Sequence, residues 1–176
     1  MTALLPRRSI ARAALFATVL LIAACVQTSG PAVHAPKPPA DYVFLSSGDN
    51  SNEKNIAVGI NTDLVMSDDP DSMTLVLFGM KFALAMQHAV PANSGSAGSG
   101  LKVDDPIIFA AAGAETEFQA AANYLVQRFP GLTNAAGYLF RSPERRYLLW
   151  VTFDTATNGN ALYFDVTKWA VAMRKN

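Results

Sequence analysis

The sequence has only one cysteine, Cys25, and only two histidines, His34 and His88. Without a second cysteine the chain cannot form an intramolecular disulfide, so the stability of its folded part must come from packing. A structural zinc site needs several thiolate or imidazole ligands that converge, and two isolated histidines do not supply them. The sequence therefore predicts no metal ion and no cofactor.

Charged side chains are also scarce, at 16% of the residues, and 14 lysines and arginines balance 14 aspartates and glutamates. Arg7, Arg8 and Arg12 precede Cys25, whereas no acid does, so the chain from Cys25 onward has 11 bases and 14 acids. A net charge of about −3 gives no general attraction to the phosphates of nucleic acid. We therefore expect no nucleic-acid partner.

The apolar run Ala13–Ile22 is short, because it has about ten residues where a membrane-spanning helix needs roughly twenty. Basic residues precede this run, and the small residues Ala23 and Ala24 follow it. A basic stretch, an apolar stretch and small residues are the three parts of a secretory signal peptide. The sequence therefore predicts a signal peptide over residues 1–24.

The next residue extends this prediction. Ile22-Ala23-Ala24-Cys25 resembles the lipobox of bacterial lipoproteins, in which an aliphatic residue and two small ones precede a cysteine. The resemblance implies that the Cys25 thiol receives a diacylglyceryl group, that cleavage follows Ala24, and that the new amino group is acylated. Several acyl chains, at about 0.8 kcal/mol per buried methylene, hold a protein firmly on a bilayer. Val26, in place of an aspartate, is typical of lipoproteins released to the outer membrane.

The sequence predicts that residues 25–41 comprise the acylated cysteine and a proline-rich linker. This stretch includes Pro31, Pro36, Pro38 and Pro39 and has little apolar surface to bury. Such a composition favours extended, polyproline-like conformations. We expect it to act as a spacer between the bilayer and a single globular domain over residues 42–176.

Within that domain, short apolar runs bounded by turn residues indicate strands. The predicted strands are Tyr42–Leu45, Ile56–Ile60, Met73–Phe82, Pro106–Ala110, Tyr138–Arg141, Arg146–Phe153 and Ala161–Phe164. Ser46–Asn52 and Ser67–Ser72 are expected to be polar loops, and periodicity leaves Ala83–Val90 undecided.

Two segments predict helices. In Glu115–Phe129 apolar residues recur at spacings of three and four, with acids at the start and Pro130 after the end. A second helix is expected after Asp165 as its N-cap, with Trp169 and Ala170 on its inner face. The order of elements predicts an α+β fold in which two helices pack on a mainly antiparallel sheet.

Few residues point to catalysis. The chain has no Gly-x-Ser-x-Gly elbow, and His88 is the one histidine after the linker. Acid–base chemistry would need two carboxylates that meet only in three dimensions. The candidates are Glu115, Glu117, Asp154 and Asp165. The start of a predicted helix already explains the presence of Glu115, Glu117 and Asp165, because acids stabilise that end of a helix.

Arg141, Arg145 and Arg146 cluster at a predicted hairpin tip, where they are a possible binding patch for a carboxylate or phosphate. A solvated turn is the plainer interpretation of the same residues. Asp63, Asp68, Asp69 and Asp71 lack the glycine and the closing glutamate of a calcium-binding loop, and turn formation explains them better.

The sequence thus favours a membrane-anchored envelope lipoprotein whose domain is a non-enzymatic binding or assembly module for another envelope protein. Such a module predicts an exposed patch on the sheet or on its C-terminal meander. One alternative is a small envelope hydrolase, which needs two acids facing each other across a cleft. Another is a ligand-sensing domain, which needs a void between sheet and helix lined by aromatic side chains.

Overall fold

The computed structural model describes residues 39–52, 55–67, 69–92, 95–110, 116–132, 134–155 and 159–173. All of them belong to one compact unit, Ala35–Asn176. The predicted signal peptide, Cys25 and most of the proline-rich linker lie outside the described residues.

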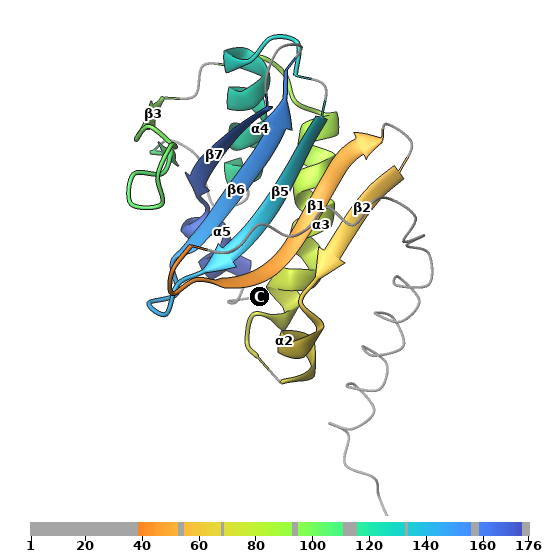
Figure 1. The fold of residues 1–176 in the computed structure, drawn as a ribbon, viewed down its shortest axis with the longest axis vertical. Helices are drawn as coiled ribbons and strands as arrows, with labels where there is room; N and C mark the ends of the chain where they lie inside the picture. Colours follow the sequence, from red (N-terminus) through yellow and green to blue (C-terminus); the bar gives the residue numbers. More distant parts are fainter. Residues whose placement is uncertain are drawn as a thin grey trace, which may run out of the picture. The chain divides into compact units, whose positions relative to one another are not determined.

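A five-stranded antiparallel sheet forms the centre of this unit, with the strand order β2-β1-β5-β6-β7 (Figure 1). Its strands are β1 (Val43–Asn52), β2 (Asn55–Ile60), β5 (Asn134–Arg141), β6 (Tyr147–Asp154) and β7 (Gly159–Asp165). A separate two-stranded ladder joins β3 (Ser96–Ala97) to β4 (Ile108–Phe109). The three C-terminal strands form the predicted meander.

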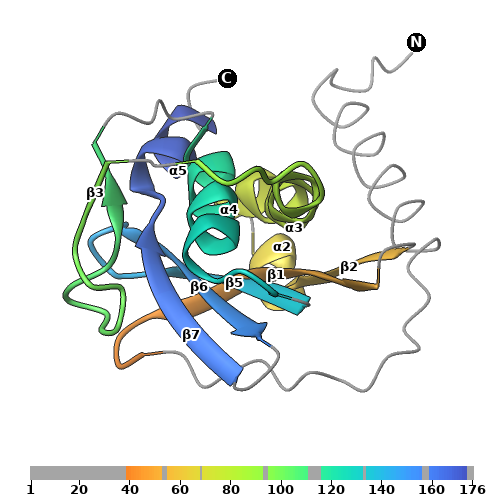
Figure 2. The ribbon, with the colours of Figure 1, turned by 90° about the horizontal axis from the view of Figure 1, so that it is seen from above.

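The helices are α2 (Thr62–Met66), α3 (Ser72–Gln87), α4 (Glu117–Arg128) and α5 (Thr167–Met173). Figure 2 shows α3, α4 and α5 on the same face of the sheet. The structure confirms the α+β fold with a mainly antiparallel sheet. It also confirms α4 and α5 as the two helices expected to pack on that sheet. Among the described residues, no helix is both long and apolar enough to span a bilayer.

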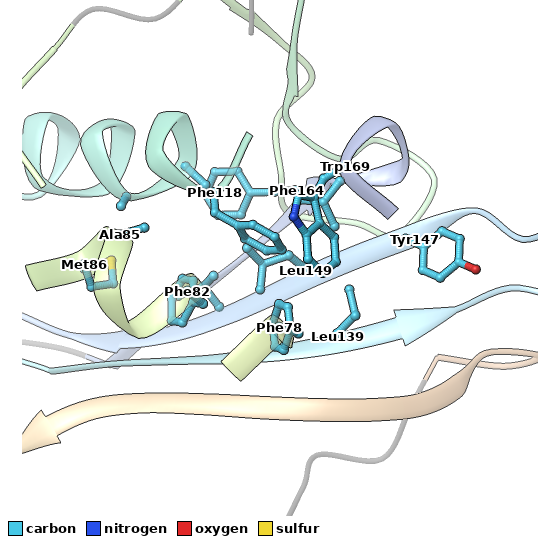
Figure 3. Packing of buried hydrophobic residues seen from close by; sticks show 14 of the residues in the cluster. Phe78, Phe82, Ala85, Met86, Phe118, Leu139, Tyr147, Leu149, Phe164 and Trp169 are labelled. Atoms are coloured by element: carbon cyan, nitrogen blue, oxygen red, sulfur yellow. The ribbon is translucent and has the colours of Figure 1, made fainter. Parts of the chain in front are cut away.

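Aromatic side chains fill the layer between the helices and the sheet (Figure 3). Phe118 of α4 lies between Phe78 of α3 and Trp169 of α5, with ring centroids 5.3 and 4.5 Å away. From the sheet, Leu149 and Phe164 join the same cluster. Aromatic pairs at these distances add to the stabilisation that burial of their area gives.

The prediction of a strand over Met73–Phe82 is wrong, because this segment is the first part of α3. Most residues of this segment are apolar, so its sequence fits both the alternation expected of a strand and the spacing expected of a helix. The pattern of burial in the structure distinguishes the two. Leu75, Phe78 and Phe82 recur at intervals of three and four and are fully buried, as in a helix that packs on two neighbours.

The expected loop Ser46–Asn52 is also wrong, because β1 continues through it. Gly48 lies so close to α3 that a Cβ atom there would be 2.6 Å from the carbonyl oxygen of Gly79. Small residues here let the helix backbone approach the strand backbone. Glycine and small polar residues are typical of a turn, but in this strand the close approach of two backbones is the reason for the glycine.

Candidate functional site

Arg141, the last residue of β5, has its guanidinium group bound by two acids from the loop before α3. Its Nη1 and Nη2 donate to the two carboxylate oxygens of Asp69, over 2.8 and 3.0 Å. Nη1 also donates to Oδ2 of Asp71. The hydrogen bond from Arg141 lowers the pKa of Asp69, and the same pairing raises the pKa of Arg141. A guanidinium group that holds two carboxylates is in the geometry that arginine favours.

Asp71 is the buried centre of this cluster, since none of its surface is exposed. Its Oδ1 accepts a hydrogen bond of 2.6 Å from the hydroxyl of Tyr147, the first residue of β6. Its backbone N–H donates to Oδ1 of Asp69 over 2.9 Å. A buried carboxylate is tolerated only when it is paired and hydrogen-bonded. The cluster therefore ties the loop before α3 to the β5–β6 hairpin.

The other two arginines of the predicted patch are placed differently. Arg146 donates from Nε to Oδ2 of Asp165 over 3.0 Å, while Oδ1 of Asp165 accepts the backbone N–H of Thr167. Arg145 is exposed in the turn, with a φ of 63°. The structure thus brings the three arginines to one hairpin, but carboxylates of the chain already bind two of them. The binding patch stays a prediction.

Glu117 is a second buried acid, only 4% exposed, at the junction of α4 and α5. Its Oε2 accepts the backbone N–H of Trp169 over 2.7 Å, which satisfies one of the unpaired donors at the start of α5. Burial raises the pKa of Glu117 to about 7; the Trp169 hydrogen bond and the charge of Lys168 lower it, and the charge of Asp165 raises it.

The candidate catalytic acids that the structure describes do not form an acid–base pair. Glu117 and Asp165 lie near enough for their charges to interact, but both also hold backbone N–H groups of α5. Asp154 is exposed at the end of β6, and Glu115 lies outside the described residues. Within the described part of the chain, no three acidic, histidine or cysteine side chains converge as metal ligands would.

The face of the sheet opposite the helices carries a row of aromatic side chains that sequence reasoning did not single out. We call it the outer aromatic face: Phe44, Tyr138, Phe140, Trp150 and Tyr163. Trp150 lies at its centre. Its ring centroid is 5.8 Å from that of Tyr138, 6.4 Å from Phe140 and 5.9 Å from Tyr163, on which it stacks.

The strand register explains the row. Tyr138, Trp150 and Tyr163 are direct neighbours across β5, β6 and β7, so their side chains point to the same face. Tyr138 and Phe140 are buried, whereas Phe44, Trp150 and Tyr163 are part-exposed. The sequence gives only a weak signal for this face, because both sets of alternating residues in Tyr147–Phe153 are largely apolar.

The described part of the chain is therefore an α+β domain with one sheet face covered by helices and an aromatic opposite face. No family model matches the chain, and no curated protein or solved structure matches it.

Proposed function

We propose that this protein is a bacterial envelope lipoprotein, anchored in the outer membrane through acylated Cys25 and facing the periplasm. Its folded domain serves as a binding or assembly module for another envelope protein. Ile22-Ala23-Ala24-Cys25, which follows a basic and then an apolar stretch, supports the anchor.

The outer aromatic face is the observation that carries the binding role. Tryptophan and tyrosine are enriched among the residues that dominate the energy of protein interfaces, because they offer a large rigid apolar area with a polar edge. Trp150 and Tyr163 are stacked and part-exposed. They lie on the face of the sheet opposite α3, α4 and α5, which Figure 2 shows together on the other face. Together with Tyr138 of β5 they form an aromatic row across three adjacent strands of the meander, which supports a binding patch on this face.

The described acids give less support to a carboxylate hydrolase. A general acid must reach its substrate, yet Glu117 is almost completely buried and its Oε2 is bound to Trp169. The raised pKa of Glu117 follows from that burial. The aromatic rings between sheet and helices pack against one another, which gives no specific support to a ligand-sensing pocket.

The anchor is tested by mass spectrometry of the protein recovered from cell membranes. We expect a mature chain that begins at Cys25 and carries a diacylglyceryl group and an amide-linked acyl chain. The Cys25→Ser variant should carry neither. A native chain that keeps its first 24 residues, or that begins with an unmodified thiol, would contradict the anchor.

The binding role is tested by a photo-crosslinking amino acid placed at Tyr163 in living cells. We expect irradiation to join the protein to an envelope protein, which mass spectrometry then identifies. The control places the same amino acid at Leu101, an exposed residue outside the outer aromatic face. Equal capture at both positions would refute a specific role for this face.

A further inference from the structure

The two edges of the sheet differ in how their main-chain hydrogen-bonding groups are used. At the β7 edge, the N–H of Tyr163 donates to the carbonyl of Gly100 over 2.7 Å. Ile107 donates to the carbonyl of Tyr163 over 2.8 Å and accepts from Asp165 over 2.9 Å. The segment around Gly100 and Ile107 therefore occupies this edge and blocks the addition of a further strand.

The β2 edge is different. The sheet ends at β2, and no described residue pairs with its outer side. The N–H of Asn61 donates to the carbonyl of Leu45 in β1 over 2.9 Å. Because main-chain groups alternate in direction along an antiparallel strand, those of Gly59 also face β1, whereas those of Val58 and Ile60 face outward.

Nothing in the composition of this edge opposes pairing with another strand. Exposed edges are usually protected by charged residues, proline or a bulge. Asn55–Ile60 contains no charged residue and no proline. The ladder with β1 has a register shift between Asp49 and Asn52, so the regular part of the edge is Ala57 to Ile60, which pairs with Ser46 to Asp49. The edge thus presents outward donors and acceptors, whose natural partner is another extended chain.

The helix next to β2 carries an apolar stripe, formed by Leu77, Met80 and Leu84 of α3. Met80 and Leu84 are 43% and 41% exposed, and Leu77 is part-buried. α3 contacts α4 through Phe78. At 3.6 residues per turn, Met80 and Leu84 face away from that contact. Figure 2 shows that side of α3 as the one beyond which no other described helix lies.

The middle of the stripe and the middle of the edge strand lie at the same level. A Cβ atom on Gly79 would be 2.5 Å from Cγ1 of Val58, so α3 crosses β2 at these two residues. Val58 is central in the well-paired part of β2, and Met80 is central in the stripe. One twofold axis beside Val58 and Met80 can therefore pair the β2 edge with the β2 edge of a second chain and, at the same time, the α3 stripe with the α3 stripe of that chain.

We infer that two copies of this chain associate through this side, with the β2 strands paired antiparallel and the α3 stripes packed together. An isologous contact requires a self-complementary surface. An uncharged edge meets an uncharged edge, and an apolar stripe meets an apolar stripe. Exposed Lys81 lies beside the stripe, where its ammonium group stays in water. The result is one continuous sheet across the pair, a property independent of Cys25 acylation.

The first test uses the Met80→Cys variant of the full chain in cell membranes, treated with a short bismaleimide. We expect a crosslinked product of twice the mass of one chain. The matched control is Leu101→Cys, at an exposed residue near the opposite edge, and the unsubstituted chain reports any reaction at Cys25. A Met80→Cys product no stronger than in both controls, or one joined only to a different protein, overturns the inference.

The second test co-expresses two full-length chains with different tags and measures how much of one is captured with the other. Met80→Glu places two like charges at the twofold axis and should lower the capture at least tenfold. Val171→Glu, at a similarly exposed residue of α5, should leave it unchanged. Unchanged capture with Met80→Glu, at a far-ultraviolet spectrum equal to that of the parent, overturns the inference.

Discussion

Asp71 shows, at the scale of single residues, how the chain accommodates a charge in its interior. An unpaired carboxylate at this depth would be strongly destabilising. Arg141 supplies the opposite charge, and the Tyr147 hydroxyl supplies a donor from a third segment. The sequence contained no sign of this arrangement, because Asp71 is 70 positions from Arg141 and 76 positions from Tyr147.

Tyr147→Phe removes the hydroxyl that donates to Oδ1 of Asp71 and leaves the rest of the ring in place. We expect the free energy of unfolding to fall by about 1–3 kcal/mol, because the lost hydrogen bond is to a buried charged acceptor. Urea denaturation measures the change. Tyr163→Phe, at a part-exposed tyrosine of β7, is the control and should stay within about 0.5 kcal/mol of the parent.

Glu117 makes stability depend on pH in a defined direction. Its pKa is about 7 in the folded state against an ordinary value of 4.5. Between these values the folded state binds more protons than the unfolded state. The free energy of unfolding therefore decreases as pH rises from about 4.5 to 7, by on the order of 3 kcal/mol. Urea denaturation across this range checks the slope.

Glu117→Gln is the matched variant for that measurement. Its amide oxygen still accepts the N–H of Trp169, but it does not titrate, so the slope between pH 4.5 and 7 should become much smaller. A slope unchanged by Glu117→Gln would contradict the assignment. Asp69 acts in another window, because its lowered pKa gives stability that is lost only as pH falls through the acidic range.

At the scale of elements, the packing of α3 on β1 depends on two glycines. Gly48 and Gly79 bring the two backbones together, so that a Cβ on Gly48 would lie 2.6 Å from one backbone atom of Gly79 and 2.8 Å from another. A flexible side chain could move away from such a contact, but a helix backbone moves only with its whole element. This contact fixes where α3 crosses the sheet.

Gly48→Ala should therefore lower the free energy of unfolding by about 1–3 kcal/mol, the usual cost of overpacking. Gly95→Ala is the control, since nothing lies within 4 Å of the added Cβ atom. Chemical denaturation of both variants gives the comparison. Equal stability of the two variants would mean that α3 is free to shift away from β1.

Local pattern was enough to predict some elements and insufficient for others. The spacing of apolar residues in Glu117–Arg128 and the alternation in Tyr147–Asp154 each favour one structure, and both elements are present. In α3 apolar residues face not only the sheet and the neighbouring helix but also solvent, where Met80 and Leu84 are exposed beside Lys81. The pattern therefore lost its period, and only the position of its neighbours decides the element.

At the scale of the whole molecule, the described residues share one hydrophobic core within Ala35–Asn176. Phe118, Phe164 and Trp169 bring α4, β7 and α5 into that core. Because every long element contributes to it, we expect this unit to unfold as a single cooperative domain.

A chain of residues 35–176 expressed alone tests this expectation. It should give one unfolding transition, with coincident curves from far-ultraviolet circular dichroism and tryptophan fluorescence. The two tryptophans report on different layers. Trp169 of α5 is buried in the core between the helices and the sheet, and Trp150 lies on the outer aromatic face. Two separate transitions would show that the helical layer and the sheet are not one cooperative unit.

The sequence by itself determined the α+β class, the C-terminal meander and two of the helices, because each rests on the period of apolar residues or on turn and cap residues close in the chain. It also supplied the lipobox resemblance at Cys25, which depends on four consecutive residues. Only the tertiary structure decided the rest: the partners of Arg141, the burial of Glu117, the outer aromatic face and the β2 edge, with which no described strand pairs on its outer side. Each of these depends on which strands and helices become neighbours, and the chain brings those neighbours together from distant positions.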